Sequence, residues 1–205
     1  MEFLSAPWWS ALLAIILIDL VLAGDNSYSG TTTVSSGTLQ VGNGGNSGSL
    51  GTGPVVNNAA ISFNRGNALT VNNTISGTGS ITQAGSGTLT LMGNNSYSGA
   101  TTVSSGTLAV GHANALGTTA GTVTVGASAT LDLLGVAVGA KPLTLNGGTL
   151  RDTTSSWAGD VVLGANSTID VGAGDTLTLS GVISGTGFGL TKTGAGAVTL
   201  GGANT

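Results

Sequence analysis

The side chains that could carry catalysis are few and far apart in this sequence. It holds one His, eight acidic and four basic residues, and no Cys. His112 stands in a Gly-His-Ala-Asn segment with no partner residue nearby, as expected of a solvated loop side chain. Ser104 and Ser105 lie in a Ser-rich stretch without a positioned base, so neither is an activated nucleophile. We predict no catalytic residue.

Two carboxylates have a spacing that resembles a calcium-binding turn. Asp170 and Asp175 flank Val-Gly-Ala-Gly, but the nonapeptide GGxGxDxUx pattern is not met and does not recur. We therefore expect both to cap turns. Asp132 and Asp152 occur singly on expected strands, and no pair of carboxylates has a sequence context that indicates a glycosidase.

The remaining polar motifs give no site either. Lys141 and Arg151 are expected to be solvated surface charges. The glycines of residues 185–189 miss the GxGxxG spacing and do not lead into a helix, so they form no phosphate loop. We expect no cofactor.

The composition excludes several classes of protein. Charged residues make up 6% of the chain, against about 25% in ordinary soluble domains. Without Cys there is no disulfide framework and no thiolate zinc site. Four basic residues in 205 are too few to bind a nucleic acid backbone. The 37 Gly have no period of three, which excludes collagen.

Short segments with alternating apolar and polar residues recur along the chain. Period-two alternation places Leu and Val on one face of a strand and Thr on the other, and Gly/Asn clusters between the segments are typical of turns. The expected strands are residues 37–41, 87–91, 106–110, 121–125, 129–133 and 175–179.

Longer stretches repeat almost unchanged. Residues 26–42 and 95–111 are identical at 15 of 17 positions, and residues 75–91 resemble residues 183–200. Short strands with tight turns permit a sandwich, an up-and-down barrel or a β-helix, but stacked near-identical units favour the β-helix. We predict an all-β fold, a right-handed parallel β-helix, with outward threonine ladders. Its narrow interior would be lined by Leu39, Val41, Leu89, Leu91, Leu108 and Val110.

These motifs resemble a known family. The string NSYSGxTTVSSGTLxVG, with ISGTGS before Gly-Thr-Leu-Thr-Leu, is similar to the autotransporter-associated β-strand repeat of type V secretion passenger domains, over about residues 26–205. The resemblance implies a secreted or cell-surface β-helix of a bacterium that is not an enzyme, has an adhesive or structural role and aids its own export. It also implies host or cell-surface ligands and a C-terminal translocator barrel. No alternating ten-residue segments with an aromatic girdle occur here, so we expect a passenger fragment.

The N-terminus differs from the rest. Residues 1–25 are nearly free of Gly and Thr, and residues 3–23 could form a membrane helix; a cleaved signal and a buried helix are alternatives. The run from Met1, with its IDLVLAGDN string, resembles the first transmembrane helix of the TerC family. This resemblance implies a metal-transport role for Asp19 and Asp25.

Three functions therefore stand, over two expected domains at residues 1–25 and 26–205. The first is the passenger fragment. The second is a TerC-like membrane protein, supported only by the segment 1–26, and a single helix cannot enclose an ion pathway. The third is a polysaccharide-active β-helix enzyme, which would need clustered Asp, Arg and Lys.

Overall fold

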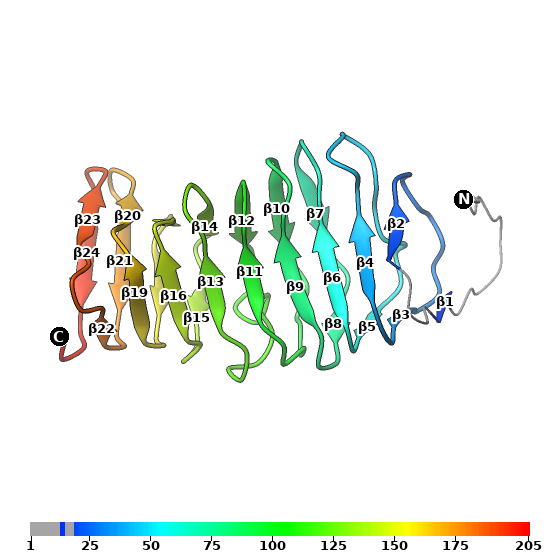
Figure 1. Cartoon of the computed structure of the whole chain (residues 1–205). Coiled ribbons are helices and arrows are strands. Elements are labelled where there is room, and N and C mark those ends of the chain that lie inside the picture. Colours follow the sequence, from blue (N-terminus) through cyan, green and yellow to red (C-terminus); the bar gives the residue numbers. More distant parts are fainter. Residues whose placement is uncertain (1–12, 15–18) are drawn as a thin grey trace.

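The protein is an elongated parallel β-solenoid. The computed structural model describes residues 13–14 and 19–205, in which the chain winds through short strands connected by turns. All strand pairs are parallel, as stacked coils require. Figure 1 shows the coils following one another along the molecule, from β2 near the N-terminus to β24 near the C-terminus. The predicted all-β solenoid is confirmed.

Each complete coil has three sides. The first side is a nine-stranded sheet, which faces the viewer in Figure 1. Its strands are β2 Leu20–Leu22, β4 Thr38–Val41, β6 Ala60–Phe63, β9 Ser80–Gln83, β11 Thr101–Val103, β13 Val123–Val125, β16 Leu143–Asn146, β19 Val161–Ala165 and β22 Ile183–Ser184.

The second side is a seven-stranded sheet that begins further along the chain. Its strands are β7 Leu69–Val71, β10 Thr88–Leu91, β12 Thr107–Val110, β14 Thr130–Leu133, β17 Thr149–Asp152, β20 Ser167–Val171 and β23 Leu190–Thr193.

The third side consists of two four-stranded sheets that occupy the same place in the coil order. Residues 92–100 and 111–122 pass between these sheets without forming a strand there. The strands before the gap are β1 Leu13–Ala14, β3 Thr32–Val34, β5 Val55–Asn57 and β8 Ile75–Ser76, and those after it are β15 Ala137–Val138, β18 Ser155–Trp157, β21 Thr176–Leu179 and β24 Ala197–Leu200.

The core is a narrow stack of aliphatic side chains. On the nine-stranded sheet Leu39, Ile61 and Ile81 are successive partners in register, and all three are buried. Alternation along each strand drives this packing, since burying one Leu or Ile side chain contributes about 1.5–3 kcal/mol. The six interior residues predicted from the sequence, Leu39, Val41, Leu89, Leu91, Leu108 and Val110, are all buried, which confirms their assignment.

The prediction of an N-terminal helix is wrong for the last residues of the predicted segment. Residues 20–22 form β2, which pairs with β4 in register, Leu20 with Leu39 and Leu22 with Val41. Val21 points outward and is 43% exposed. The continuous apolar run hid a period-two pattern, because the outward position carries Val where other strands carry Thr. The solenoid therefore includes residues before the expected boundary at residue 26.

The rest of the predicted membrane helix lies largely outside the described residues. Within residues 13–14 and 19–205 no helix is long and apolar enough to span a membrane. Leu13–Ala14 pairs with β3 as a strand of the third side.

The two copies of the long repeat lie on different sides of the solenoid. In residues 26–42 the segment Thr-Thr-Val forms β3 on the third side, and Thr-Leu-Gln-Val forms β4 on the nine-stranded sheet. In residues 95–111 the same segments form β11 on the nine-stranded sheet and β12 on the seven-stranded sheet. Identical sequences are thus displaced by one side and do not stack on each other.

Coil length explains the displacement. The interval from the start of β4 at Thr38 to the start of β11 at Thr101 spans three coils of the nine-stranded sheet. The interval between the two repeat copies, from Asn26 to Asn95, is longer than these three coils, and the excess is close to the length of one side. The shorter pair behaves alike: β8, β9 and β10 of one copy correspond to β22, β23 and β24 of the other, each one side further round.

Candidate interaction surface

The outer faces carry rows of threonine, as the sequence predicts. On the seven-stranded sheet six threonines follow one another in register: Thr88, Thr107, Thr130, Thr149, Thr168 and Thr191. On the nine-stranded sheet a second row contains Thr82, Thr102, Thr124 and Thr144. β-branched Thr is well suited to outward strand positions, and its hydroxyl can hydrogen-bond to a partner or to water.

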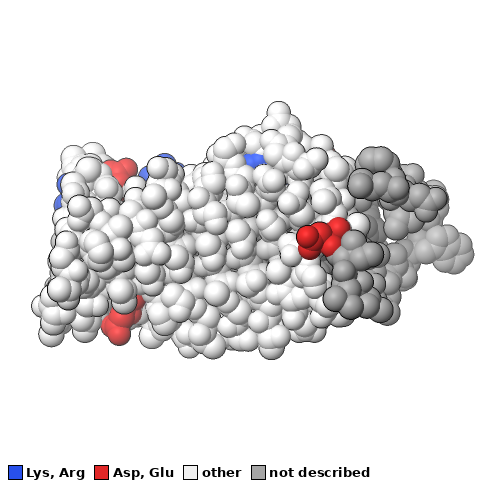
Figure 2. Space-filling model, in the orientation of Figure 1, with Lys and Arg blue, Asp and Glu red and all other residues white. Residues whose placement is uncertain are grey.

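Charge is distributed very unevenly over this scaffold. Between Asn26 and Leu131 the sequence contains a single charged residue, Arg65, and its side chain is only 10% exposed. Figure 2 shows the consequence, since the face toward the viewer is almost uncharged over the middle of the molecule. A surface of hydroxyl and amide groups without charges would bind a partner with little electrostatic steering.

Arg65 holds a surface loop in place. Its guanidinium donates to the carbonyl oxygens of Gly48, at 2.8 Å, and of Asn46, at 2.5 Å. It also donates twice to Asn67 Oδ1 and lies 3.6 Å from a carboxylate oxygen of Asp25. The exposed segment 43–47 is thereby fixed beside the solenoid. Arg65 has a structural task here, because its donors are engaged within the chain.

Three charged side chains of the C-terminal coils form a row on the seven-stranded sheet. Asp132, Arg151 and Asp170 are successive partners in register. Arg151 donates to a carboxylate oxygen of Asp132 at 2.5 Å, and this bond raises the pKa of the guanidinium. Asp170 accepts from the hydroxyl of Thr193 at 2.9 Å. Arg151 lies at the surface as expected, with its side chain 47% exposed, but the strand register also brings it beside Asp132.

Lys141 is also not the surface residue that the sequence suggests. It is 2% exposed, its ammonium donates to the carbonyl oxygen of Thr118 at 2.6 Å, and it lies 6.0 Å from the centre of the Tyr97 ring. Burial lowers the pKa of Lys141 to about 8 and raises that of the Tyr97 hydroxyl. The neighbouring coils enclose the whole side chain, which no local pattern in the sequence reveals.

Asp170 and Asp175 do not form a common site. Asp175 accepts from the hydroxyl of Thr154 at 3.0 Å, whereas Asp170 pairs with Thr193 on a different strand. Asp152 points into the core, where one oxygen accepts from Ser155 N at 3.2 Å and the other has no hydrogen-bond partner. Each carboxylate thus has its own separate environment.

The other candidate residues are dispersed as well. His112 Nδ1 accepts a local bond from Asn114 N at 3.0 Å, and Ser104 lies at a turn after β11. Asp19 is exposed just before β2, while Asp25 accepts from Gly48 N at 2.9 Å. In the described part of the chain no three His, Cys, Asp or Glu side chains are grouped closely enough to hold a metal ion.

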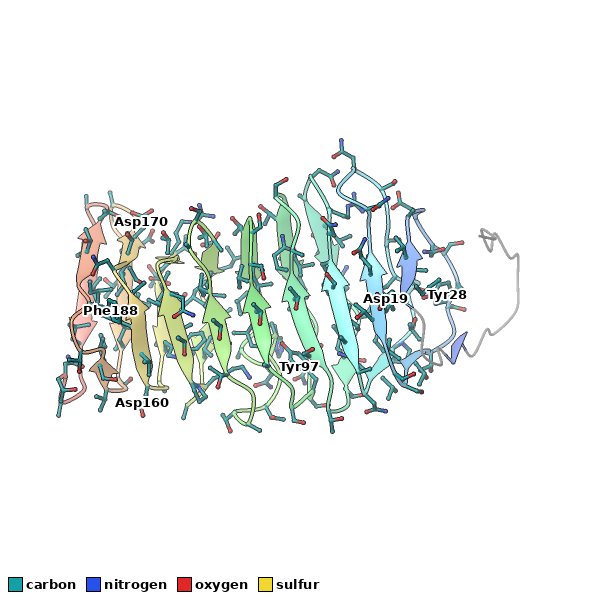
Figure 3. The ribbon with its side chains drawn as sticks, viewed as in Figure 1. Asp19, Tyr28, Tyr97, Asp160, Asp170 and Phe188 are labelled. Atoms are coloured by element: carbon teal, nitrogen blue, oxygen red, sulfur yellow. The ribbon has the colours of Figure 1, made fainter. Side chains whose placement is uncertain are left out.

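A two-coil motif around the repeated tyrosine was missed at the sequence level. Tyr28 and Tyr97 each hydrogen-bond to the Thr four residues later at 2.8 Å, and Figure 3 shows one near the N-terminal end of the solenoid and the other further along it. In each copy the next coil places a Leu-Gly-Thr segment over the tyrosine, and the Thr N–H donates to the tyrosine carbonyl. These segments are residues 50–52 and 116–118.

An asparagine of the repeat ties the two coils together. Asn95 accepts from Ile75 N at 2.8 Å and donates to the carbonyl oxygen of Ala115 at 2.7 Å. In the other copy Asn26 donates to the carbonyl oxygen of Ser49 at 2.7 Å. The sequence does contain a signal for this motif, because Ser/Ala-Leu-Gly-Thr recurs at residues 49–52 and 115–118. The signal is hard to recognise because the number of residues between the tyrosine and this segment differs between the copies.

Comparison with known proteins agrees with this architecture. Residues 19–41, 81–110 and 190–205 match the family model described as Passenger-associated-transport-repeat. The three matched segments lie in different parts of the solenoid. The first match starts at Asp19, so the matched segment includes β2 and most of the IDLVLAGDN string. The comparisons give no support to the TerC resemblance of residues 1–26.

The chain is also similar to one curated protein. In an alignment 201 residues long that covers 81% of this chain, it is 40% identical to the "Adhesin BmaC autotransporter" of Brucella suis biovar 1 (strain 1330). It spans about 6% of the length of that relative. The resemblance to autotransporter passenger repeats is thereby confirmed. No solved structure matches the chain significantly.

Proposed function

We propose that this chain is part of an autotransporter passenger and acts at the bacterial cell surface, or after secretion, as a non-catalytic adhesive scaffold. The observation that carries this proposal is the similarity to an autotransporter adhesin over most of the chain. The solenoid supports it, since each coil contacts only its neighbours and the array presents long outer faces.

The surface supports a neutral type of recognition. Residues 26–131 are rich in hydroxyl and amide side chains, and the one charged residue among them is held by internal bonds. Such a surface fits host or cell-surface ligands that are themselves neutral, polar and hydroxylated. An enzymatic role has less support, because the charged row pairs its Asp132 and Arg151 with each other.

Surface display tests the proposal directly. The chain, fused to a translocator barrel, is displayed on otherwise non-adherent bacteria, and attachment to epithelial cells is counted at low and at high salt. We expect display to increase attachment several-fold, with little change between the two salt conditions, because few exposed charges are present to be screened. Cells that display the barrel alone are the control. Attachment no higher than that of the control would contradict the adhesive role.

A further inference from the structure

The outer face of the nine-stranded sheet has one continuous row without charge. We call the following residues the central row; each is the register partner of the next: Val21, Gln40, Ser62, Thr82, Thr102, Thr124, Thr144, Val162 and Ser184. Val21 and Val162 are 43% and 45% exposed, whereas the other seven side chains of the row are less exposed. The row thus combines an ordered array of hydroxyl groups with an exposed apolar side chain near each end.

The other two sides are less suited to face-to-face packing. The third side is interrupted at residues 92–100 and 111–122, where no strand forms. The seven-stranded sheet carries Asp132, Arg151 and Asp170 on its outer face, and taking charges out of water is costly. Asp19 and Asp160 directly precede strands β2 and β19 of the nine-stranded sheet and lie outside the central row, where they would remain hydrated at the rim of a contact.

We propose that the nine-stranded sheet is a contact surface for a second copy of the chain, packed face to face, parallel and in register. This inference rests on the proposed function, because passengers anchored to one cell surface project in the same direction. In a parallel pair the central row meets itself, so Val21 and Val162 contact their own counterparts and threonines contact threonines. Because two copies of the same chain have the same strand spacing of about 4.8 Å, each of the nine positions in the row can face its counterpart in the other copy.

The expected contact is small. Nine strands at about 4.8 Å spacing extend over about 38 Å, and strands of about four residues are about 13 Å long, giving a face of about 500 Å² per copy. The pair would bury about 1,000 Å² in total, at the lower limit for a specific interface. We therefore expect a weak pair in solution that is strengthened when many copies share one surface.

Engineered cysteines test the geometry, and the absence of native Cys keeps the background clean. Single-cysteine variants Thr102→Cys and Val162→Cys are oxidised at high protein concentration, and disulfide-linked dimers are measured on non-reducing gels. The matched control is Thr149→Cys, in the threonine row of the seven-stranded sheet. We expect both central-row variants to cross-link at least fivefold more than the control. A Val162→Cys yield equal to that of the control would overturn the parallel pairing.

The same experiment separates the orientations. In an antiparallel pair Val162 lies far from its counterpart, so Val162→Cys would cross-link only when mixed with a cysteine variant at the other end, such as Gln40→Cys. That outcome would overturn the proposed parallel arrangement.

A charge placed in the row tests the contact independently. In a parallel pair Thr124→Lys places two ammonium groups against each other, and we expect it to reduce the cross-linking of Val162→Cys at least fivefold. Thr149→Lys is the control and should leave the yield unchanged. Thermal unfolding followed by circular dichroism verifies that both lysine variants remain folded. Equal yields in the two variants would contradict the inference. Adhesion of displayed cells is measured separately, so failure of the pairing is distinguishable from failure of the adhesive function.

Discussion

The two copies of the long repeat have nearly the same sequence but different surroundings. Tyr97 is completely buried, whereas Tyr28 is only partly buried. Both make the same bond to a threonine at 2.8 Å. Local geometry therefore follows the repeated sequence, while burial follows the position of the copy in the stack. This difference can be tested by making the same substitution in both copies.

The largest difference is expected at the tyrosine itself. Tyr97→Ala should lower the free energy of unfolding by about 3–5 kcal/mol, the range for removing a buried aromatic side chain. Tyr28→Ala should cost less than half as much, because its ring is already partly hydrated. Urea unfolding followed by circular dichroism measures both. Tyr97→Phe is the control and should lose about 1 kcal/mol, the contribution of one hydrogen bond. Equal losses for the two alanine variants would mean that position in the stack does not set the stability.

A smaller difference is expected at the asparagine. Asn95→Ala leaves the buried Ile75 N–H without its acceptor, which should cost about 1–3 kcal/mol. Asn26 bonds at a more exposed site, and Asn26→Ala should cost about 1 kcal/mol or less. The same unfolding measurement applies, and hydrogen exchange at the Ile75 amide identifies the local cause. An Asn95→Ala variant as stable as the parent would show that this bond adds nothing to the motif.

The smallest difference is one of pH dependence. In each copy a third coil hydrogen-bonds to the coil that carries the Leu-Gly-Thr segment. In the Tyr28 copy the Asn73 side chain donates to the carbonyl oxygens of Gly51 and Gly53. In the Tyr97 copy the Lys141 ammonium donates to the carbonyl oxygen of Thr118. Only Lys141 can titrate. Its pKa of about 8 in the folded chain lies below the ordinary 10.5, so the folded state disfavours the protonated form. Stability should therefore rise as the pH increases from about 8 toward 10.

Lys141→Met provides the control for this effect. The variant should lose most of the rise in the denaturation midpoint between about pH 7.5 and about 9, which stays below the pKa of about 10 of tyrosines in the unfolded chain. Asn73→Ala should change stability equally at every pH. A parent protein whose midpoint does not change over this window would refute the role of Lys141.

Much of the fold was predictable because its signals are local. The alternation in residues 37–41 and 106–110 predicts strands with Leu39 and Leu108 inside, and both side chains are buried. The near-identical copies favour a solenoid over a closed barrel. The strand Leu20–Leu22 was missed because an outward valine removed the alternation on which the prediction depends.

The charged residues show where local signals end. Lys141 and Arg151 look alike in the sequence, since each is a basic residue with no other basic residue beside it. The fold buries Lys141 against Tyr97 and sets Arg151 beside Asp132, and both contacts join residues from different coils. Which coil lies above another depends on the lengths of all the turns between them.

The sequence by itself determined that the chain forms short strands with one apolar face, that these stack as repeats, and that its surface is poor in charge. These properties follow from residue type and from periods of two, which act within a few residues. Only the tertiary structure decided that equivalent repeats occupy different sides, that nine outward positions align in one uncharged row, and that Lys141 is buried. The physical reason is that side and register depend on the number of residues in each coil. This number varies along the chain and takes effect only when the coils are stacked.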